Sequence, residues 1–197
     1  DAVLPPHEIT GGRKGRVALK QAMKVLFQKP TAIMVTTGLI CQVFVNIAYL
    51  TWMPTFLYEK FNMSITKAGF TSMFFMFGFA FIGILVSGRV SDRIASFRKQ
   101  VRLEVQAYGM LLGAPFIILI GTAGTPVVAY IGLAGYGLFR GIYDANIWAS
   151  LYDVIVPKYR ASASGVMLLL AFTAGAFAPY LLGVLKPMFG LSLSISG

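Results

Sequence analysis

The stretch Gly88–Arg102, GRVSDRIASFRKQVR, carries five cations and one carboxylate between two long runs that contain no charged residue. Residues 68–88 lead into it, residues 105–139 follow it closely, and both runs are mostly apolar. Apolar runs of this length are typical of transmembrane helices, and charged residues between them mark a return to water. This alternation therefore predicts a membrane protein.

The composition of the whole chain supports the same class. Of its 197 residues, 57% are hydrophobic and only 12% are charged, whereas soluble domains carry about 25% charged residues. A soluble fold would expose apolar patches larger than monomers tolerate. The net charge of +10 does not indicate a nucleic-acid partner, because the cations lie in bands between apolar runs and are not gathered with polar and aromatic residues on one face.

The lengths of the apolar runs predict an all-α, multi-pass transmembrane helix bundle. A hydrocarbon core of about 30 Å needs roughly 20 helical residues, and the turn GTAGTP at 121–126 divides the longest run into two crossings. No run shows the alternation of a barrel strand. The five predicted spans cover about 31–52, 68–87, 103–120, 127–151 and 161–185.

The positive charges predict which connections face the cytoplasm. Counted from the amino-terminal region to the residues after the fifth span, the cations number six, two, five, zero, two and one. Under the positive-inside rule, residues 1–29, 88–102 and 152–160 are cytoplasmic in a cell-membrane protein. Residues 1–29 also alternate apolar and basic side chains, which predicts a linker containing an interfacial helix on the bilayer.

Catalysis and metal binding are not expected from this sequence. The chain has one cysteine and one histidine, and it contains no HExxH or GxSxG motif. We therefore predict neither an enzyme, nor a metal site, nor a cofactor.

Two motifs resemble a known family of membrane proteins. GRVSDR (88–93), followed by basic residues, resembles the loop signature of the major facilitator superfamily, where it joins the second and third helices of each six-helix half. PKYRASASG (157–165) resembles the start of the fifth helix of a half. The resemblance implies a secondary transporter working by alternating access, with this chain as its carboxy-terminal half and an amino-terminal half as its partner. It also implies a sixth span in this half, which is missing here or only begins in LSLSISG (191–197).

Other segments resemble particular branches of that superfamily. LTWMPTFLYEKF (50–61) resembles the end of the seventh helix in sugar-acid and organic-anion symporters. The region 140–160 also resembles spinster-like lipid transporters. We expect transport of a small organic anion, such as a sugar acid or sugar phosphate, coupled to protons or another cation. A lipid transporter and a non-transporting membrane scaffold or sensor remain alternatives.

The family signature also implies a gating role for its residues. Gly88 lacks a side chain and permits close helix approach, and Arg93 completes the charged motif. Asp92 is expected near the positive amino-terminal end of the fifth span, or paired with Arg160, where such a contact latches one transport state. The alternative is a solvated charge that only sets topology.

The fourth span contains the strongest candidate for a substrate site, YGLFRGIYDANIW (136–148). Arg140 and Asp144 stand four residues apart on one helical face, with Arg140 roughly 20 Å along the helix from its start. A guanidinium at this depth can clamp a carboxylate or phosphate, and Asp144 can accept a coupling proton. Tyr136 and Tyr143 belong to the same stretch. The alternative is a self-neutralising pair that holds helices together.

A polar stripe on the first span is the second candidate. Gln42, Asn46 and Tyr49 follow at spacings of four and three, so they share one helical face. Such a face needs a wet cavity or an interhelical hydrogen bond, because lipid leaves amides unpaired. Elsewhere, the pairs Gly109/Gly113 and Gly137/Gly141 predict close helix packing.

Overall fold

The computed structural model describes residues 23–24, 26–95, 97–98 and 100–185. These residues form helices joined by short connections, with no strand among them, which confirms the all-α prediction. A further helical stretch covers residues 178–185 after a turn at Phe177. Most of the predicted linker 1–29, and the start of a sixth span, lie outside the described residues. The elements are α2 (Pro30–Phe61), α3 (Ile65–Ala95), α4 (Val101–Thr122), α5 (Pro126–Val154), the 3-10 helix η1 (Pro157–Tyr159) and α6 (Arg160–Ala176).

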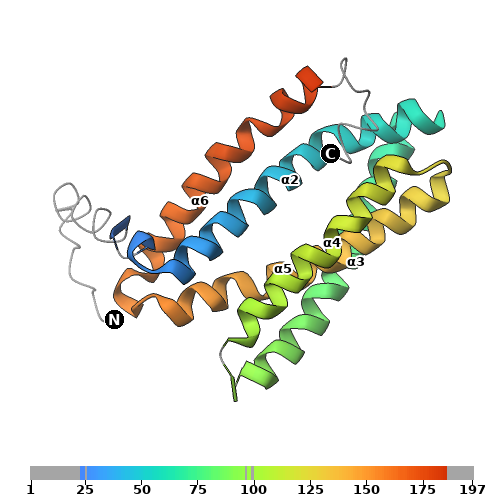
Figure 1. Cartoon of the computed structure of the whole chain (residues 1–197). Helices are drawn as coiled ribbons and strands as arrows, with labels where there is room; N and C mark the ends of the chain where they lie inside the picture. The colour runs from blue at the N-terminus through green and yellow to red at the C-terminus, as the bar shows by residue number, and fades with distance from the viewer. Residues whose placement is uncertain (1–22, 25, 96, 99, 186–197) are drawn as a thin grey trace, which may run out of the picture.

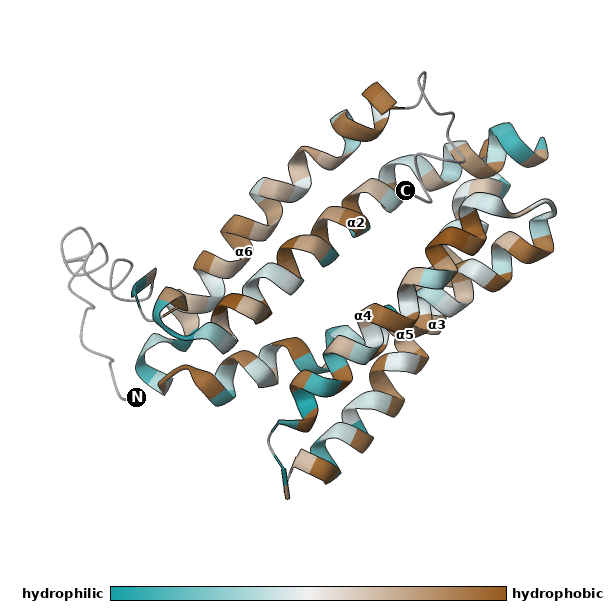
Figure 2. Cartoon of the chain, viewed as in Figure 1, coloured by the Kyte–Doolittle hydropathy of each residue, from teal (hydrophilic) through white to brown (hydrophobic). Residues whose placement is uncertain are grey.

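Four stretches of the described chain are long and apolar enough to cross a membrane. They are Pro30–Phe61, Ile65–Ala95, Val101–Thr122 and Pro157–Leu185. Figure 2 shows hydrophobic residues along most of their length, with hydrophilic segments gathered toward the helix ends. The fourth predicted span (127–151) corresponds to α5, which is 29 residues long but is not among these four stretches. Its charged and amide side chains lower its mean hydropathy.

The helices form two groups. Helix α5 packs against α3 and α4, whereas α2 runs beside α6 and also contacts α3 and α5 (Figure 1). One apolar cluster, with Leu39, Ile147 and Met167, joins α2, α5 and α6. A second cluster, with Met53 and Met76, lies farther along the bundle. The core is therefore divided into two regions along the length of the bundle.

One end of the bundle gathers most of the described cations, and we call it the basic end. Helices α2, α4 and α6 begin there, and α3 and α5 end there. Lys29 donates a hydrogen bond to the carbonyl of Val154 (2.7 Å), which links the start of α2 to the end of α5. The cations at the basic end are Lys29, Arg89, Arg93, Arg98, Arg102, Lys158 and Arg160.

Helix α2 is longer than the first predicted span. This span was predicted to end near residue 52, but the helix continues through Pro54 to Phe61. A proline removes one hydrogen bond from a helix, and membrane helices tolerate it because neighbouring groups satisfy the freed carbonyl. The helix ends at Asn62, which has a φ of 53° in the left-handed region.

Helix α3 is also longer than predicted, which changes the setting of the family signature. Gly88, Asp92 and Arg93 lie on the last turns of this helix and not in a loop. Ser87, Ser91 and Ala95 are buried at successive fourth positions, so one face continues to pack beyond residue 87. This continuing buried face explains the added turns of helix.

Glycines bring α5 into backbone contact with its neighbours. A Cβ atom added at Gly137 would overlap the carbonyl oxygen of Met76, and one at Gly141 would overlap that of Ala80. On the α4 side, a Cβ at Gly109 would lie 3.1 Å from the carbonyl oxygen of Phe139. The predicted glycine packing is confirmed at these positions.

Gly88 does not show the close helix packing that was predicted for it. A Cβ atom added there would meet nothing within 4 Å in the described chain. The close approach predicted for Gly88 is therefore wrong within this part of the protein. The residue that approaches α5 is Gly83, where a Cβ would overlap the carbonyl oxygen of Leu138.

Substituting Gly141 by alanine should destabilise the bundle by about 3 kcal/mol, because the new methyl group meets a backbone carbonyl that cannot rotate away. The matched control is Gly78→Ala on α3, which is exposed and has open space around it. Thermal unfolding in detergent, followed by size-exclusion chromatography, should show a lower midpoint for Gly141→Ala alone. Equal midpoints for the two variants would contradict the contact.

Candidate functional site

A cavity of about 210 Å³ lies between α2, α4 and α5. Four residues predicted for substrate binding, Gln42, Tyr136, Arg140 and Tyr143, lie in its wall. The remaining wall is apolar or glycine and comes mainly from α4. These other residues are Val45, Gly109, Met110, Gly113, Ala114, Ile117 and Phe139.

Among the described residues, Arg140 is the only charged one in the wall of this cavity. Its Nε atom lies 3.3 Å from Oδ2 of Asp144, and the side chains of the two residues are 12% and 31% exposed. Its guanidinium carbon also lies 5.2 Å from the centre of the Phe77 ring, a cation–π distance. The Nη1 atom of Arg140 is buried without a hydrogen-bond partner among the described residues, whereas Nε is engaged by Asp144. The ion pair thus leaves donor capacity on Arg140 unused.

Gln42 connects α2 to this ion pair. Its Nε2 atom donates a long hydrogen bond of 3.4 Å to Oδ1 of Asp144. The hydroxyl of Tyr143 is buried without a hydrogen-bond partner in the described chain, and it lies against Gly38 of α2. The Arg140–Asp144 pair therefore lies where α2 meets α5.

Asn46 and Tyr49 do not line this cavity. Tyr49 donates a hydrogen bond of 2.9 Å to the carbonyl of Ser72, and its ring centre lies 6.2 Å from that of Tyr136. The Oδ1 atom of Asn46 is buried with no hydrogen-bond partner among the described residues. The polar stripe on α2 is thus split, since Gln42 faces the cavity while Tyr49 ties α2 to α3.

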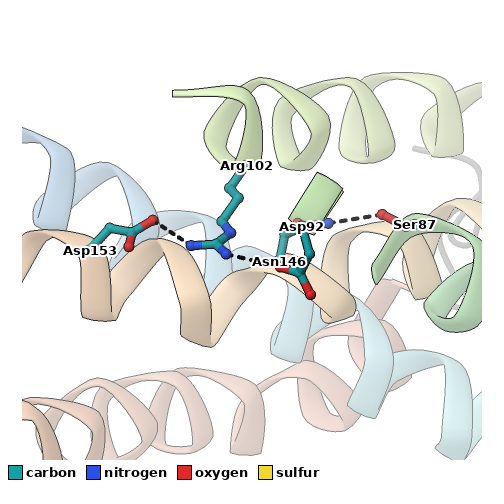
Figure 3. A network of polar contacts seen from close by, with 5 residues as sticks. All are labelled: Ser87, Asp92, Arg102, Asn146 and Asp153. Carbon is teal, nitrogen blue, oxygen red and sulfur yellow. Dashed lines mark hydrogen bonds and ion pairs between the residues drawn. The ribbon is translucent and has the colours of Figure 1, made fainter. Parts of the chain in front are cut away.

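A second polar cluster lies at the basic end (Figure 3). Arg102, on the first turn of α4, forms ion pairs with Asp92 of α3 (2.9 Å) and Asp153 of α5 (2.8 Å). One guanidinium therefore holds the ends of three helices. Arg98 and Glu104 form a more exposed ion pair nearby.

The predicted contacts of Asp92 with α6 or Arg160 are therefore wrong. Asp92 points toward Arg102 (Figure 3). Arg160 instead donates hydrogen bonds to the carbonyls of Tyr152 (2.7 Å) and Ile155 (3.2 Å). The last carbonyls of a helix carry a partial negative charge, so Arg160 stabilises the end of α5.

A hydrogen bond between an amide and a hydroxyl group joins α3 and α5 farther from the basic end than the Arg102 ion pairs. Asn146 of α5 donates hydrogen bonds to Oγ of Ser87 on α3 (2.9 Å) and to the carbonyl of Ile142 (3.0 Å). Ser87 also donates to the Ile142 carbonyl (3.3 Å). These bonds join α3 and α5 where glycine contacts have already brought them together.

Comparison with known sequences identifies the family. The sequence profile of the Major Facilitator Superfamily matches residues 3–179. The chain belongs to this superfamily. It is a multi-pass membrane protein of a transporter family, in agreement with the resemblance inferred from its motifs.

Relatives within the superfamily match only part of their length. A probable L-galactonate transporter of Escherichia coli (strain K12) is 27% identical over 158 residues, which cover 76% of this chain and 34% of that protein. Protein spinster homolog 1 of Xenopus laevis is 28% identical over 182 residues (83% and 34%). The probable sulfoacetate transporter SauU of Cupriavidus necator is 31% identical over 156 residues (76% and 36%).

This superfamily member spans about a third of the length of these curated relatives. No solved structure matches it significantly. Among the described residues, no group of three His, Cys, Asp or Glu side chains lies close enough to hold a metal ion.

Three residues of the basic-end cluster were not predicted from the sequence. Arg102 was counted only as a topogenic cation, and Asp153 and Ser87 were not singled out. Their common signal is position, because each is a polar residue one or two turns from the end of a long apolar helix. Only the packing of three helices brings them together.

The ion pair between Arg102 and Asp153 should contribute about 1 kcal/mol to stability, because the two side chains are only 20% and 27% exposed. A double-mutant cycle with Arg102→Gln and Asp153→Asn measures this coupling as a difference in unfolding free energy. The control cycle uses Arg98 and Glu104, which are 61% and 40% exposed and should couple by about 0.3 kcal/mol. Equal coupling in both cycles would argue against the bridging role of Arg102.

Proposed function

We propose that this chain forms the carboxy-terminal half of a secondary active transporter that moves a small organic anion by alternating access. Membership of the superfamily and the predominantly apolar helices support this proposal. Since the chain spans about a third of its relatives, the amino-terminal half of the transporter would come from residues outside this sequence. The transporter would then alternate between an inward-facing and an outward-facing state by movement of the two halves relative to each other.

The proposed orientation has the basic end in the cytoplasm of a cell membrane. Residues 88–102 and 152–160 lie at this end, as do the first described residues before α2. The turn at 121–126, at the other end, contains no cation. This difference in charge is the basis for the orientation.

The observation that carries the proposed substrate class is the buried guanidinium of Arg140. It lies in the wall of the cavity, and its Nη1 atom lacks a hydrogen-bond partner in the described chain. A fixed cation with unused donors favours a carboxylate, sulfonate or phosphate, and its planar fork can form two parallel hydrogen bonds to such a group. Gln42 and the Tyr143 hydroxyl lie nearby for further polar contacts.

The named substrates of two relatives fit this chemistry. L-galactonate and sulfoacetate are both small molecules with an anionic terminal group. The cavity volume of about 210 Å³ is below the range of about 300–1,000 Å³ common for drug-sized ligands. We therefore assign the site to a compact metabolite, such as a sugar acid or sugar phosphate.

Asp144 is the proposed coupling group. While Asp144 is ionised, it competes with the substrate for Arg140, at a distance of 3.3 Å. Protonation would remove that competitor, so that proton binding and anion binding favour each other. Gln42 then positions the carboxyl group through Oδ1.

Gating is proposed for the end of α3. Asp92 is held by Arg102, yet its side chain remains 71% exposed. Arg93 is also exposed, and Gly88 has open space above it. These three residues are therefore accessible for contact with the other half of the transporter, while Arg160 stabilises α5.

A lipid substrate is the second candidate. It is favoured by the similarity to protein spinster homolog 1 and by the apolar wall contributed by Val45, Met110 and Ile117. The small volume of the cavity and the charge of Arg140 favour the compact anion.

Replacing Arg140 by alanine in the full-length protein should weaken binding of the anion about 100-fold, because two charge-assisted hydrogen bonds of about 1.5 kcal/mol each are lost. Arg140→Lys should lose about tenfold, since an ammonium group keeps the charge without the planar fork. Arg89→Ala, an exposed arginine on α3, is the matched control. Binding is measured by isothermal titration with sugar acids, sugar phosphates and sulfonates.

Two results would contradict the assignment of Arg140 to anion binding. Unchanged affinity in Arg140→Ala, with normal folding, would return the pair to a purely structural role. Translocation of a fluorescent lysolipid by proteoliposomes, without competition from any anion, would favour the lipid substrate.

The Asp144→Asn variant should uncouple transport from the proton gradient. The neutral amide cannot release a proton, so accumulation driven by an inward gradient should fall to background, while exchange of labelled for unlabelled substrate continues. Both rates are measured in the same proteoliposomes, and Glu104→Gln, at an exposed carboxylate of the basic end, is the control. Gradient-driven accumulation that survives in Asp144→Asn would exclude this residue as the coupling group.

A further inference from the structure

Five buried polar side chains line the interface of α3, α4 and α5 between the cavity and the basic end. Each is at most 5% exposed, and among the described residues a single hydrogen bond, from Asn146 to Ser87, joins two of them directly. They lie outside the wall of the Arg140 cavity. The five residues are Ser87, Ser91, Gln106, Asn146 and Ser150.

The register of α3 on α5 places two of the serines beside each other. Met76 faces Gly137, Ala80 faces Gly141, and Ser87 bonds to Asn146, so the two helices run in the same direction. One helical turn beyond Ser87 is Ser91, and one turn beyond Asn146 is Ser150. The two buried hydroxyl groups therefore occupy the same level of the interface.

The register of α4 places Gln106 at this level too. Helix α4 runs opposite to α5, because Gly109 lies against Phe139 and Tyr143 while Arg102 pairs with Asp153. Gln106 lies between Gly109 and Arg102 in the sequence, so it faces the segment 146–150 of α5. Three helices thus place buried polar groups in one region of their shared interface, which we call the polar seam.

Several atoms of this seam lack a hydrogen bond within the described chain. They are Oγ of Ser91, Oγ of Ser150, Nε2 of Gln106 and Nε of Arg102. Buried polar groups in native proteins are almost always satisfied by protein or by ordered water. Four such atoms in one seam therefore require a ligand.

Water is the ligand that fits this set of atoms. The Nε–H of Arg102 can only donate, whereas the serine hydroxyls can both donate and accept. A metal cation would leave the arginine donor unsatisfied and would be repelled by its charge. Water accepts from the arginine, bonds to the amide and hydroxyls, and commonly forms about three hydrogen bonds when buried.

We propose that α3, α4 and α5 enclose a file of buried water, that is, a row of hydrogen-bonded water molecules. It extends from the Asp92–Arg102–Asp153 ion pairs to the cavity. At the outer end, the side chains of Asp92 and Asp153 are 71% and 27% exposed. At the inner end, Gly109 and Tyr143 line the cavity one turn from Gln106 and Asn146. The file joins the basic end to the cavity while the three helices remain packed.

In the proposed transporter, this file gives protons a route between the basic end and Asp144. That use rests on the proposed function, whereas the presence of water does not. The hydration of the seam can therefore be tested without measuring transport.

The test measures exchange of a buried thiol proton with heavy water. Ser91→Cys and Ser150→Cys are each placed in the full-length protein, and the infrared S–H stretch is followed after transfer into D₂O. The difference spectrum against the parent protein isolates the introduced thiol. The control is Ile147→Cys, a buried position on the face of α5 that packs against α2 and α6.

We expect both serine-derived thiols to exchange at least about 100-fold faster than the Ile147 control, because buried water exchanges directly whereas the control must wait for local opening. Exchange at the control rate in both variants would show a dry seam and overturn the proposal. Such a result would leave anion binding by Arg140 unaffected, so the two proposals fail separately.

A second measurement does not depend on cysteine variants. In a dry seam, Gln106→Leu removes an unsatisfied amide and should raise the melting temperature. In a hydrated seam, the same change places an apolar side chain against bound water and should lower it. A higher melting temperature for Gln106→Leu would also overturn the proposal.

Discussion

Charged and amide side chains at membrane depth must be enclosed by protein, because lipid offers them no hydrogen bonds. Helix α5 carries Arg140, Asp144 and Asn146 in its middle and second half. Helix α5 contacts α2, α3, α4 and α6, most extensively α3 and α4. The four apolar stretches thus pack around the helix that lipid would tolerate least.

The glycines explain how this enclosure divides the bundle. Gly83, Gly137 and Gly141 bring the backbones of α3 and α5 together, and Gly109 does the same for α4. Helix α2 instead meets α5 through longer side chains, including the bond from Gln42 to Asp144. The Arg140 cavity lies at this looser boundary, where α2 meets the tightly packed α3–α4–α5 group.

The sequence was sufficient for the fold class and for part of the candidate site. Apolar run length predicted the helices, and an arginine and an aspartate four residues apart predicted the Arg140–Asp144 pair, because both depend on local spacing. The partner of Asp92 could not be predicted in this way. It depends on how far α3 continues past Gly88 and on where α4 begins. Ser91 and Ala95 remain buried along the added turns of α3, and this burial follows from packing between helices, which local spacing does not show.

Helix α5 also connects the two polar regions mechanically. Arg140 and Asp153 are separated by about 20 Å of one helix, and the second of them is tied through Arg102 to α3 and α4. A displacement of α5 relative to α2 would change the contact between Gln42 and Asp144. If α3 and α4 moved with α5, held by the glycine contacts, the Arg102 bridge would stay intact. The close glycine contacts and the Arg102 bridge thus favour α3, α4 and α5 as one rigid group, whereas the longer side-chain contacts of α2 with α5 make their boundary the more adaptable wall of the Arg140 cavity.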